Sequence, residues 1–561
     1  MRRLLPYAFA LLLLHQTASA QDIEQSTKQS PVSINGSIDL RGIAYSVTGI
    51  PERRKPFSYI LCGNTNLVLY GLEIPLSFVV SEQDRNFSQP FNQFGLSPKY
   101  KWLTLHAGYR NLSFSPYTLD GYTMLGAGIE IKPKGFQLCA MYGRMNRATA
   151  IDTTLGTLQP FSFSRTGLAI KLGVGDEKNN FIISVLRAKD DSSSVGIIDP
   201  VTKQLVRPAA NTVGSAAFRN QFGKHLFVEA DAGASLWTND IGSTYAVTDS
   251  TNQWVDKIRK IMPVNGTTEF YYAYRAATGF TSNAFSLKFE YKYVDPQFRS
   301  MGVYYFNNDI KSYTVSPSFN LFKNRFRLSG SIGKQDDNVR DQKEATTSRT
   351  IGMANLSWDI TQQFGVDAGF TNFSSNSKPT VVLVQNKYLL AQSNSNISFT
   401  PRYVFANSRH SHVVIASYNR SSLVDDNSIT QTVNNITTEI ILLNYTYTMV
   451  KRALSITGAI NRATNELVTG KFENMSYTLA LNKNWFKGKL IAALNNTYTT
   501  SKGPLGETGI YNLMVNANYQ PSRHHRFNLR YTLLNNKPEN ASNTQIKFAE
   551  NTTEIGYTLS F

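Results

Sequence analysis

The chain has 561 residues, with 57 Lys and Arg against 39 Asp and Glu, so its formal net charge is +18. Aromatic residues make up 12 % of the chain, which excludes a disordered protein because disordered chains are poor in them. Two cysteines in this length exclude a disulfide scaffold. The charged fraction of 17 % is low for the three or four soluble domains that the length alone suggests.

Residues 1–20 have the three parts of a secretory signal peptide. Two arginines follow the first Met, an apolar run covers residues 8–14, and small residues at 18–20 form a cleavage site. The apolar run is shorter than the roughly 20 residues that a spanning helix needs. We therefore expect a secreted chain in which residues 21–31 form a short periplasmic N-terminal segment.

The remaining chain alternates between apolar and polar residues. From 284 to 294, Phe, Leu and Tyr alternate with Ser, Lys and Glu, and the pattern recurs at 103–110, 326–332, 441–449 and 527–533. Successive side chains of a strand point to opposite faces, so each segment predicts one apolar and one polar face. The segments run about 10 to 14 residues, which is long for a soluble sandwich and fits a tilted strand that crosses a membrane.

In lipid, every backbone polar group must be paired, so a sheet of such strands must close. Residues 32–561 therefore predict an all-β fold, a large closed antiparallel transmembrane β-barrel of about 26 strands (roughly 24–26). The first half of the expected strands are 32–48, 57–71, 75–82, 91–98, 102–113, 121–132, 135–148, 160–174, 178–189, 209–222, 225–237, 268–281 and 283–294. The second half are 309–322, 325–336, 346–358, 363–374, 393–405, 409–420, 434–448, 452–463, 472–484, 487–499, 508–520, 524–535 and 549–561.

The links between these strands alternate in length. Outer-membrane barrels have short periplasmic turns and long outer loops, so we place the tight links on the periplasmic side. The tight links include Pro133-Lys134, Lys323-Asn324, Val450-Lys451, Trp485-Phe486 and Pro521-Ser522-Arg523, and the long ones include 189–208, 238–267, 374–392 and 536–548.

The C-terminus places Ile555, Tyr557, Leu559 and Phe561 on one strand face. This segment resembles the last strand of Gram-negative outer-membrane β-barrel proteins, which ends in Phe after alternating apolar positions. The resemblance implies an outer-membrane location and a role for Tyr557, Leu559 and Phe561 as the signal read by the barrel-assembly machinery. Residues 94–102 and 106–110 also resemble the large barrels of Bacteroidota-type bacteria.

Basic residues on the polar faces are the main candidate site. We expect them to face the lumen, where clustered cations concentrate anions. They are Arg110, Lys288, Lys292, Arg325, Arg327, Arg402 and Arg530. The alternative is that these basic residues are ordinary solvated side chains of the lumen. Acidic neighbours such as Glu229, Asp231 and Glu290 would then partly cancel their positive charge.

No motif predicts catalysis, a cofactor or a metal site. His106 shares a face with Arg110, and no Ser, Asp or Glu is spaced along the sequence to orient it, so we expect it to line the pore. His410 and His412 are expected to be a polar surface pair because a third ligand is missing.

Cys62 and Cys139 fall on about the second and seventh expected strands. Neighbouring strands lie about 4.8 Å apart and a disulfide needs Cα atoms within roughly 7 Å, so non-adjacent strands are too distant. We expect both thiols to be free.

The longest loop, about 238–267, contains Trp254, Ile258 and Ile261 at helical spacing, and Pro263 ends the pattern. Two outcomes are open for this candidate helix. It enters the barrel mouth as a constriction or as the seat of a partner subunit, or it caps the rim.

The expected function is a porin-like passive channel for hydrophilic, including anionic, solutes, and not an enzyme. A TonB-dependent importer is disfavoured because residues 21–31 are too short for an N-terminal plug. The first alternative is a barrel subunit of an export or surface-protein assembly, filled by partner subunits or lipoproteins. The second is an outer-membrane hydrolase. Expected partners are outer-membrane lipid and the assembly machinery, and nucleic acid is excluded because no soluble basic module is present.

Overall fold

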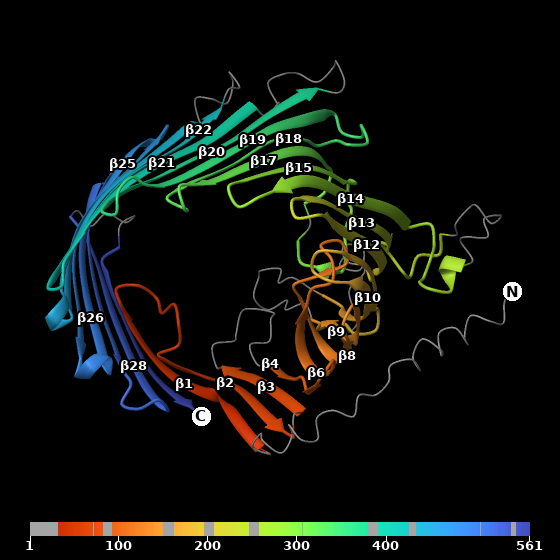
Figure 1. Ribbon diagram of the computed structural model, residues 1–561, viewed down its shortest axis with the longest axis horizontal. Coiled ribbons are helices and arrows are strands. Elements are labelled where there is room, and N and C mark those ends of the chain that lie inside the picture. Colours follow the sequence, from red (N-terminus) through yellow and green to blue (C-terminus); the bar gives the residue numbers. More distant parts are fainter. Residues whose placement is uncertain are drawn as a thin grey trace.

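The computed structural model describes residues 32–70, 72–81, 93–149, 162–195, 207–245, 257–305, 307–379, 391–425, 434–504, 506–539 and 546–561. The predicted signal peptide and residues 21–31 lie outside these ranges. Within them, a sheet of 27 strands closes into the ring that Figure 1 shows. Because β4 and β5 together fill the place between β3 and β6, the closed antiparallel barrel has 26 strand positions, as predicted.

The first half of the ring contains β1 (Val32–Thr48), β2 (Phe57–Leu69), β3 (Leu72–Ser81), β4 (Gln93–Leu96), β5 (Lys99–Tyr100), β6 (Leu103–Leu112), β8 (Tyr122–Ile131), β9 (Phe136–Asn146), β10 (Ser164–Gly175), β11 (Asn180–Asp191), β12 (Ala210–Phe222), β13 (Leu226–Thr238), β14 (Thr268–Thr281) and β15 (Phe285–Val294). The second half contains β17 (Ile310–Leu321), β18 (Phe326–Asp336), β19 (Ala345–Asp359), β20 (Phe364–Pro379), β21 (Ala391–Ala406), β22 (His410–Asp425), β23 (Ile436–Met449), β24 (Leu454–Leu467), β25 (Gly470–Trp485), β26 (Leu490–Gly503), β27 (Gly506–Tyr519), β28 (His525–Pro538) and β29 (Phe548–Ser560). The 3-10 turns η3 (Val450–Arg452) and η4 (Phe486–Gly488) form two tight links, and β7 (Leu119–Asp120) pairs with β16 (Gly302–Val303) apart from the ring.

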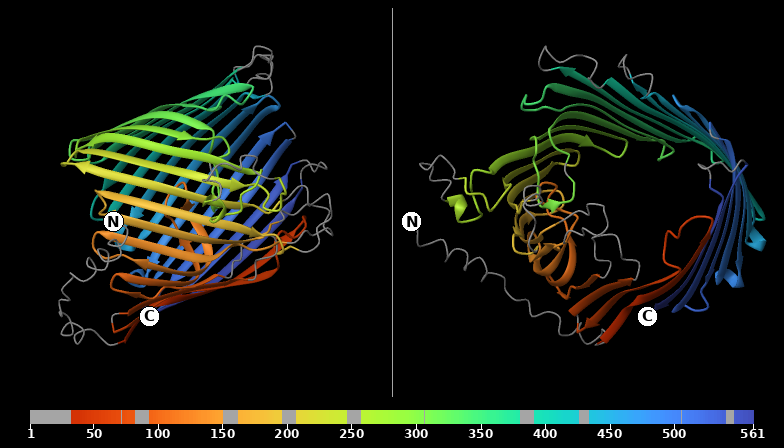
Figure 2. Two further views of the ribbon diagram at one scale, coloured as in Figure 1. Left: turned by 90° about the vertical axis from the view of Figure 1, so that its right-hand side faces the viewer. Right: turned by 180° about the vertical axis from the view of Figure 1, so that it is seen from behind.

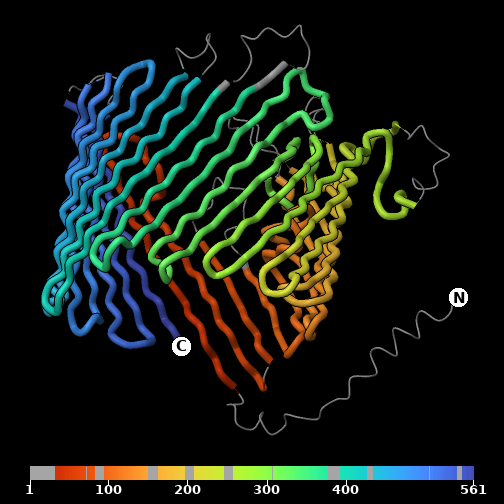
Figure 3. The backbone as a smooth tube through the Cα atoms, turned by 45° about the horizontal axis from the view of Figure 1, so that its top comes forward, coloured from red at the N-terminus to blue at the C-terminus, as the bar shows by residue number. Residues whose placement is uncertain are grey.

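The first and last strands close the barrel. β1 pairs antiparallel with β29 from Ser37 opposite Ser560 to Thr48 opposite Ala549. Beyond β29, the Gly36 amide donates to the Phe561 carbonyl at 2.8 Å, and the Phe561 amide donates back at 3.0 Å. Figures 2 and 3 show the strands tilted steeply across the wall, as a closed barrel requires.

Several strands differ from their predicted bounds, and β20 and β22 each end five residues later than expected. The strand expected at 91–98 is broken between β4 and β5 because Pro98 has no N–H to donate to the ladder. β24 and β25 also extend beyond their expected ends, so that only residues 468–469 separate them. The links opposite the tight turns are therefore not all long. No helix among the described residues is long and apolar enough to cross a membrane.

The two faces of the wall differ in chemistry. On β23, Leu443 and Tyr445 are exposed and lie on the outer face, whereas Asn444 and Thr446 lie on the inner face. Hydroxyl pairs link neighbouring strands on the inner face at 2.8–3.2 Å. Examples are Thr446 with Thr457, Thr478 with Thr497, Ser476 with Thr499, and Ser316 with Ser331. This is the apolar and polar alternation that the sequence predicts.

Candidate functional site

Two connecting segments fold into the ring and pack on the inner wall near β10–β13 (Figure 1). Residues 113–121 contain β7, and residues 295–305 and 307–309 form a second segment that contains β16. The two short strands pair in parallel, with Gly302 opposite Leu119 and Val303 opposite Asp120. We call these two segments the shelf.

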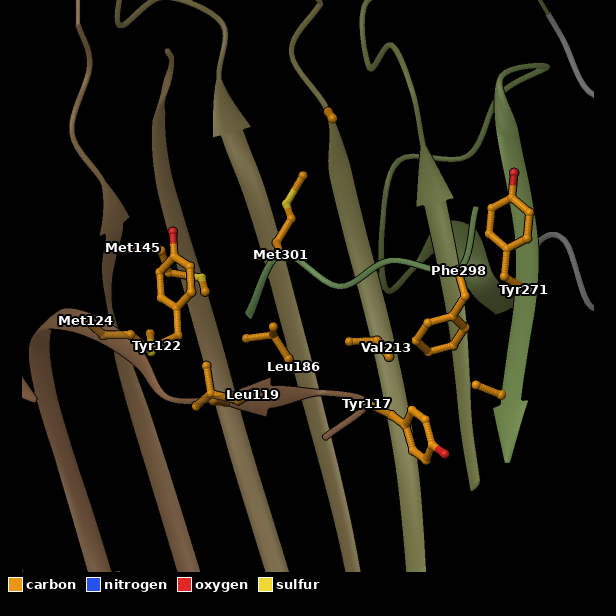
Figure 4. Packing of buried hydrophobic residues seen from close by; sticks show 14 of the residues in the cluster. Tyr117, Leu119, Tyr122, Met124, Met145, Leu186, Val213, Tyr271, Phe298 and Met301 are labelled. Carbon is orange, nitrogen blue, oxygen red and sulfur yellow. The ribbon is translucent and has the colours of Figure 1, made fainter. Parts of the chain in front are cut away.

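An apolar core holds the shelf on the wall, as Figure 4 shows. Its buried side chains include Leu119, Phe298 and Met301 of the shelf and Leu186 and Val213 of the wall, each at most 2 % exposed. Tyr117 packs edge-to-face on Phe298, with ring centroids 5.9 Å apart. A Cβ atom at Gly233 of β13 would lie 2.5 Å from the Tyr117 Cβ, so the wall needs glycine there for the shelf to dock.

Hydrogen bonds join the shelf to polar groups of the wall. The Met301 amide donates to Asn211 Oδ1 at 3.1 Å, and the Ser235 hydroxyl donates to the Arg299 carbonyl at 2.8 Å. The Thr118 hydroxyl lies 3.1 Å from the Ser184 hydroxyl. Since buried polar groups are costly when unpaired, these bonds fix one docked position of the shelf.

A third segment, residues 337–344 between β18 and β19, clamps the shelf. Arg340 donates to both carboxylate oxygens of Asp295, at 2.9 and 2.5 Å, and Asp295 is fully buried. Lys343 forms an ion pair with Asp309, which also accepts the Val339 amide at 2.9 Å. The segment therefore ties both ends of 295–309 to the next hairpin.

The clamp predicts a pH dependence of stability. Burial alone would raise the pKa of Asp309, but bonds from Lys343 and the Val339 amide outweigh it and lower that pKa below its ordinary value. A lowered folded-state pKa gives stability that is present above about pH 4 and lost as pH falls through the folded pKa. We expect Asp309→Asn to lower the thermal unfolding midpoint of the purified protein at pH 7, and the gap to the wild type to be smaller at pH 3, because protonation of Asp309 removes the charge that Lys343 pairs with. An equal gap at both pH values would show that ionisation of Asp309 is not the cause.

The predicted basic residues on β15 belong to a network of ion pairs. Arg275 of β14 contacts Asp231 at 2.5 Å and both Glu229 and Glu290 at 3.4 Å. Lys288 contacts Glu229 at 3.1 Å and Glu290 at 2.9 Å. The register puts these residues on the sheet face that carries the shelf. Three carboxylates therefore face two cations, and the positive charge of Lys288 is balanced.

The other predicted basic residues are spread around the same face. Arg402 pairs with Asp359 and Asp367, and Arg530 lies opposite Glu554 across the β28–β29 ladder. No ion pair is found among the described residues for Arg530 or for the remaining four. Lys292 lies opposite Arg275, and Arg110 lies opposite Met124. Arg327 donates to the Ser357 hydroxyl at 3.1 Å, and Arg325 donates to two backbone carbonyls in a tight link. The structure thus spreads the predicted basic residues over several strands: Lys288 and Lys292 share β15, and Arg325 and Arg327 flank the first residue of β18.

The expectation that nothing orients His106 is wrong. The Ser97 hydroxyl lies 2.9 Å from His106 Nδ1, and Glu130 Oε2 lies 3.5 Å from Nε2. Glu130 comes from the neighbouring strand β8, so spacing along the sequence cannot reveal it. Ser97 is only 1 % exposed, His106 is 4 % exposed, and Lys132 pairs with Glu130. The arrangement has the residue types of a hydrolase triad, but its serine and its histidine are both buried.

We therefore expect a fluorophosphonate probe to leave the folded protein unlabelled, because Ser97 is covered. An active serine hydrolase labelled in parallel is the control, and gel fluorescence is the readout. Labelling that disappears in Ser97→Ala would contradict this prediction and point to an enzyme.

The remaining sequence candidates have ordinary surroundings. His410 and His412 are hydrogen-bonded through Nδ1 to the hydroxyls of Tyr447 and Tyr445, at 2.7 and 2.8 Å. Both cysteines are free, as predicted. Tyr557 and Leu559 lie on the outer face of β29 beside the seam, and their role in assembly stays a prediction.

The candidate helix of the longest loop is present in part. Residues 257–259 are helical, Ile258 is half-buried and Ile261 is 49 % exposed, whereas Trp254 lies outside the described residues. Figure 1 places this short helix outside the ring of strands, away from the shelf. The part that the structure describes therefore does not narrow the barrel, and contact with a partner or the rim stays a prediction.

Comparisons with known proteins find distant structural similarity. No family model and no curated protein matches the chain. Similar solved structures include the P pilus usher (PapC) translocation pore, at 9 % identity and a TM-score of 0.37, covering 94 % of this chain and 99 % of that one. The FrpB iron transporter from Neisseria meningitidis has 9 % identity, a TM-score of 0.40 and coverage of 96 % and 84 %. OccAB4 of Acinetobacter baumannii has 12 % identity, a TM-score of 0.31 and coverage of 71 % and 99 %.

Proposed function

We propose that the protein is a porin-like passive channel of the outer membrane for hydrophilic solutes. The observation that carries this proposal is a closed wall with an apolar outer face and an inner face of hydroxyl, amide and charged groups. A wall of this kind is suited to hydrocarbon outside and water inside. Outer-membrane lipid and the barrel-assembly machinery are the partners that this location implies.

Aromatic groups near both ends of the strands support the membrane location. Near the ends opposite the tight links, Tyr272 stacks on Tyr293 with ring centroids 5.4 Å apart. Near the tight links, Phe527 packs on Tyr557 at 5.1 Å. Amphipathic rings favour the two membrane–water interfaces, so the apolar band between these levels is the expected lipid contact.

The charge network favours weak ion selectivity. Because Lys288 and Arg402 are paired with carboxylates, the inner wall is less positive than the sequence suggests. We propose that solutes pass beside the shelf, which occupies part of the cross-section. The preference for anions then depends on cations without carboxylate partners and not on the basic residues as a group.

Single-channel recording in planar bilayers tests the proposal. We expect purified protein to give discrete, persistent current steps with only mild preference for one ion sign. Insertion without current, with other chains co-purifying, would overturn the channel and favour the barrel subunit of a larger assembly. Heat-denatured protein is the control for detergent artefacts.

A further inference from the structure

We propose that the inner wall carries a binding site for an acidic saccharide, at a hollow between the shelf and β18–β22. This proposal rests on the channel function and names a solute class for it. The hollow has a volume of about 590 Å³. Asn307 of the shelf lines one side, and side chains from five consecutive strands line the other. A solute that passes beside the shelf would meet this surface.

Two neighbouring cross-strand rows build the wall of the hollow. The first row runs Gln335, Arg349, Ser375 and Gln392, each opposite the next across β18, β19, β20 and β21. The second row lies two residues further along the strands, on the same face, and includes Phe373 opposite Asn394. Side chains two apart on one strand share a face, so both rows point into the hollow together.

Arg349 supplies the charge of the site. Among the described residues it has no carboxylate within ion-pair distance, and the described lining includes no Asp or Glu. Arg275 and Arg402 differ in this respect, because each is already paired with a carboxylate of the wall. A guanidinium without such a partner offers a planar pair of N–H donors that fits a carboxylate on a ligand.

The neutral residues fit the hydroxyl groups and the ring of a sugar. Gln335, Gln392 and Asn394 each present both a donor and an acceptor, as neighbouring sugar hydroxyls require. Phe373 is 43 % exposed, so its ring offers an apolar surface to the C–H face of a sugar ring.

An unsatisfied polar group gives independent support. Ser375 is only 4 % exposed, and its hydroxyl has no hydrogen-bond partner among the described residues. A buried hydroxyl without a partner is costly, and a ligand hydroxyl in the hollow would satisfy it.

Current blockade by defined saccharides tests the site. The probes are digalacturonate, the neutral disaccharide lactose, and glutarate as a charged molecule without a sugar ring. In the wild type we expect saturable blockade by digalacturonate, with a half-blocking concentration at least about tenfold below those of lactose and glutarate, since a charge-assisted bond adds to ring and hydroxyl contacts. Equal values for digalacturonate and either comparator would overturn the proposal.

Matched variants locate the effect. Arg349→Gln should remove the tenfold preference over lactose, whereas Arg327→Gln, at the opposite end of the neighbouring strand and outside the hollow, should retain it. Phe373→Ala should weaken digalacturonate and lactose alike by about fivefold. An unchanged preference in Arg349→Gln would overturn the site.

A separate measurement distinguishes this proposal from the channel itself. If the purified protein carries no current, the channel function fails, and calorimetric titration of the same protein with digalacturonate decides the site alone. Binding that is lost in Arg349→Gln would support the site, and no binding by the wild type would overturn it.

Discussion

Replacing residues 296–308 with a short Gly-Ser linker is expected to raise the single-channel conductance at least about twofold, because constrictions control flow through a pore. The ends of this segment already meet, since the Asp309 amide donates to the Asp295 carbonyl at 3.1 Å. A linker can therefore close the hairpin without disturbing β15 or β17. The remaining strand β7 loses its partner, and more of the cross-section opens to water.

A single substitution provides a milder version of the same test. In Gly233→Val, the new Cβ would lie 2.5 Å from the Tyr117 Cβ, which is too close, so the shelf must move. Gly458→Val is the matched control, because a Cβ at Gly458 has open space around it. We expect altered or noisier conductance for the first variant and wild-type steps for the second. Unchanged conductance in both the linker variant and Gly233→Val would show that the shelf does not limit flow.

Leu443→Arg is expected to destabilise the membrane-embedded barrel by about 2–4 kcal/mol, the cost of an arginine on the lipid face near the bilayer midplane. Leu443 is 49 % exposed, on the outer face, and lies near the middle of β23. The measurement is the free energy of unfolding from lipid vesicles, by urea titration followed through Trp fluorescence.

The neighbouring residue supplies the control for that substitution. Asn444→Arg puts the same side chain on the inner face of the same strand, where water solvates it, so we expect a loss below about 1 kcal/mol. Equal losses for the two variants, or a larger loss for Asn444→Arg, would mean that the faces have been assigned the wrong way round.

The sequence predicts the barrel well because strand faces alternate with period two. Residues 527–533 and 441–449 alternate throughout, and the tight links around Lys323-Asn324 and Val450-Lys451 mark the strand ends. The break at Pro98 and the extension of β24 are local effects that alternation alone does not define.

The shelf and the clusters could not be predicted in the same way. Apolar residues such as Tyr117, Phe298 and Met301 lie in connecting segments without a period, and their presence in loops expected to be polar was the available signal. The helical spacing in the 238–267 loop instead made that loop the predicted candidate for a constriction. The contact of His106 with Glu130 and the position of Arg349 beside Ser375 depend on which strands pair and in which register.

The placement of hydrocarbon against the outer face can be measured with a fluorophore on Leu443→Cys or Asn444→Cys, after both native cysteines are replaced by alanine. With the protein in vesicles, we predict that brominated acyl chains quench the probe at position 443 and aqueous iodide quenches the probe at 444. Quenching of the 443 probe by iodide alone, in a chain that stays monomeric in detergent-free buffer, would contradict a membrane barrel.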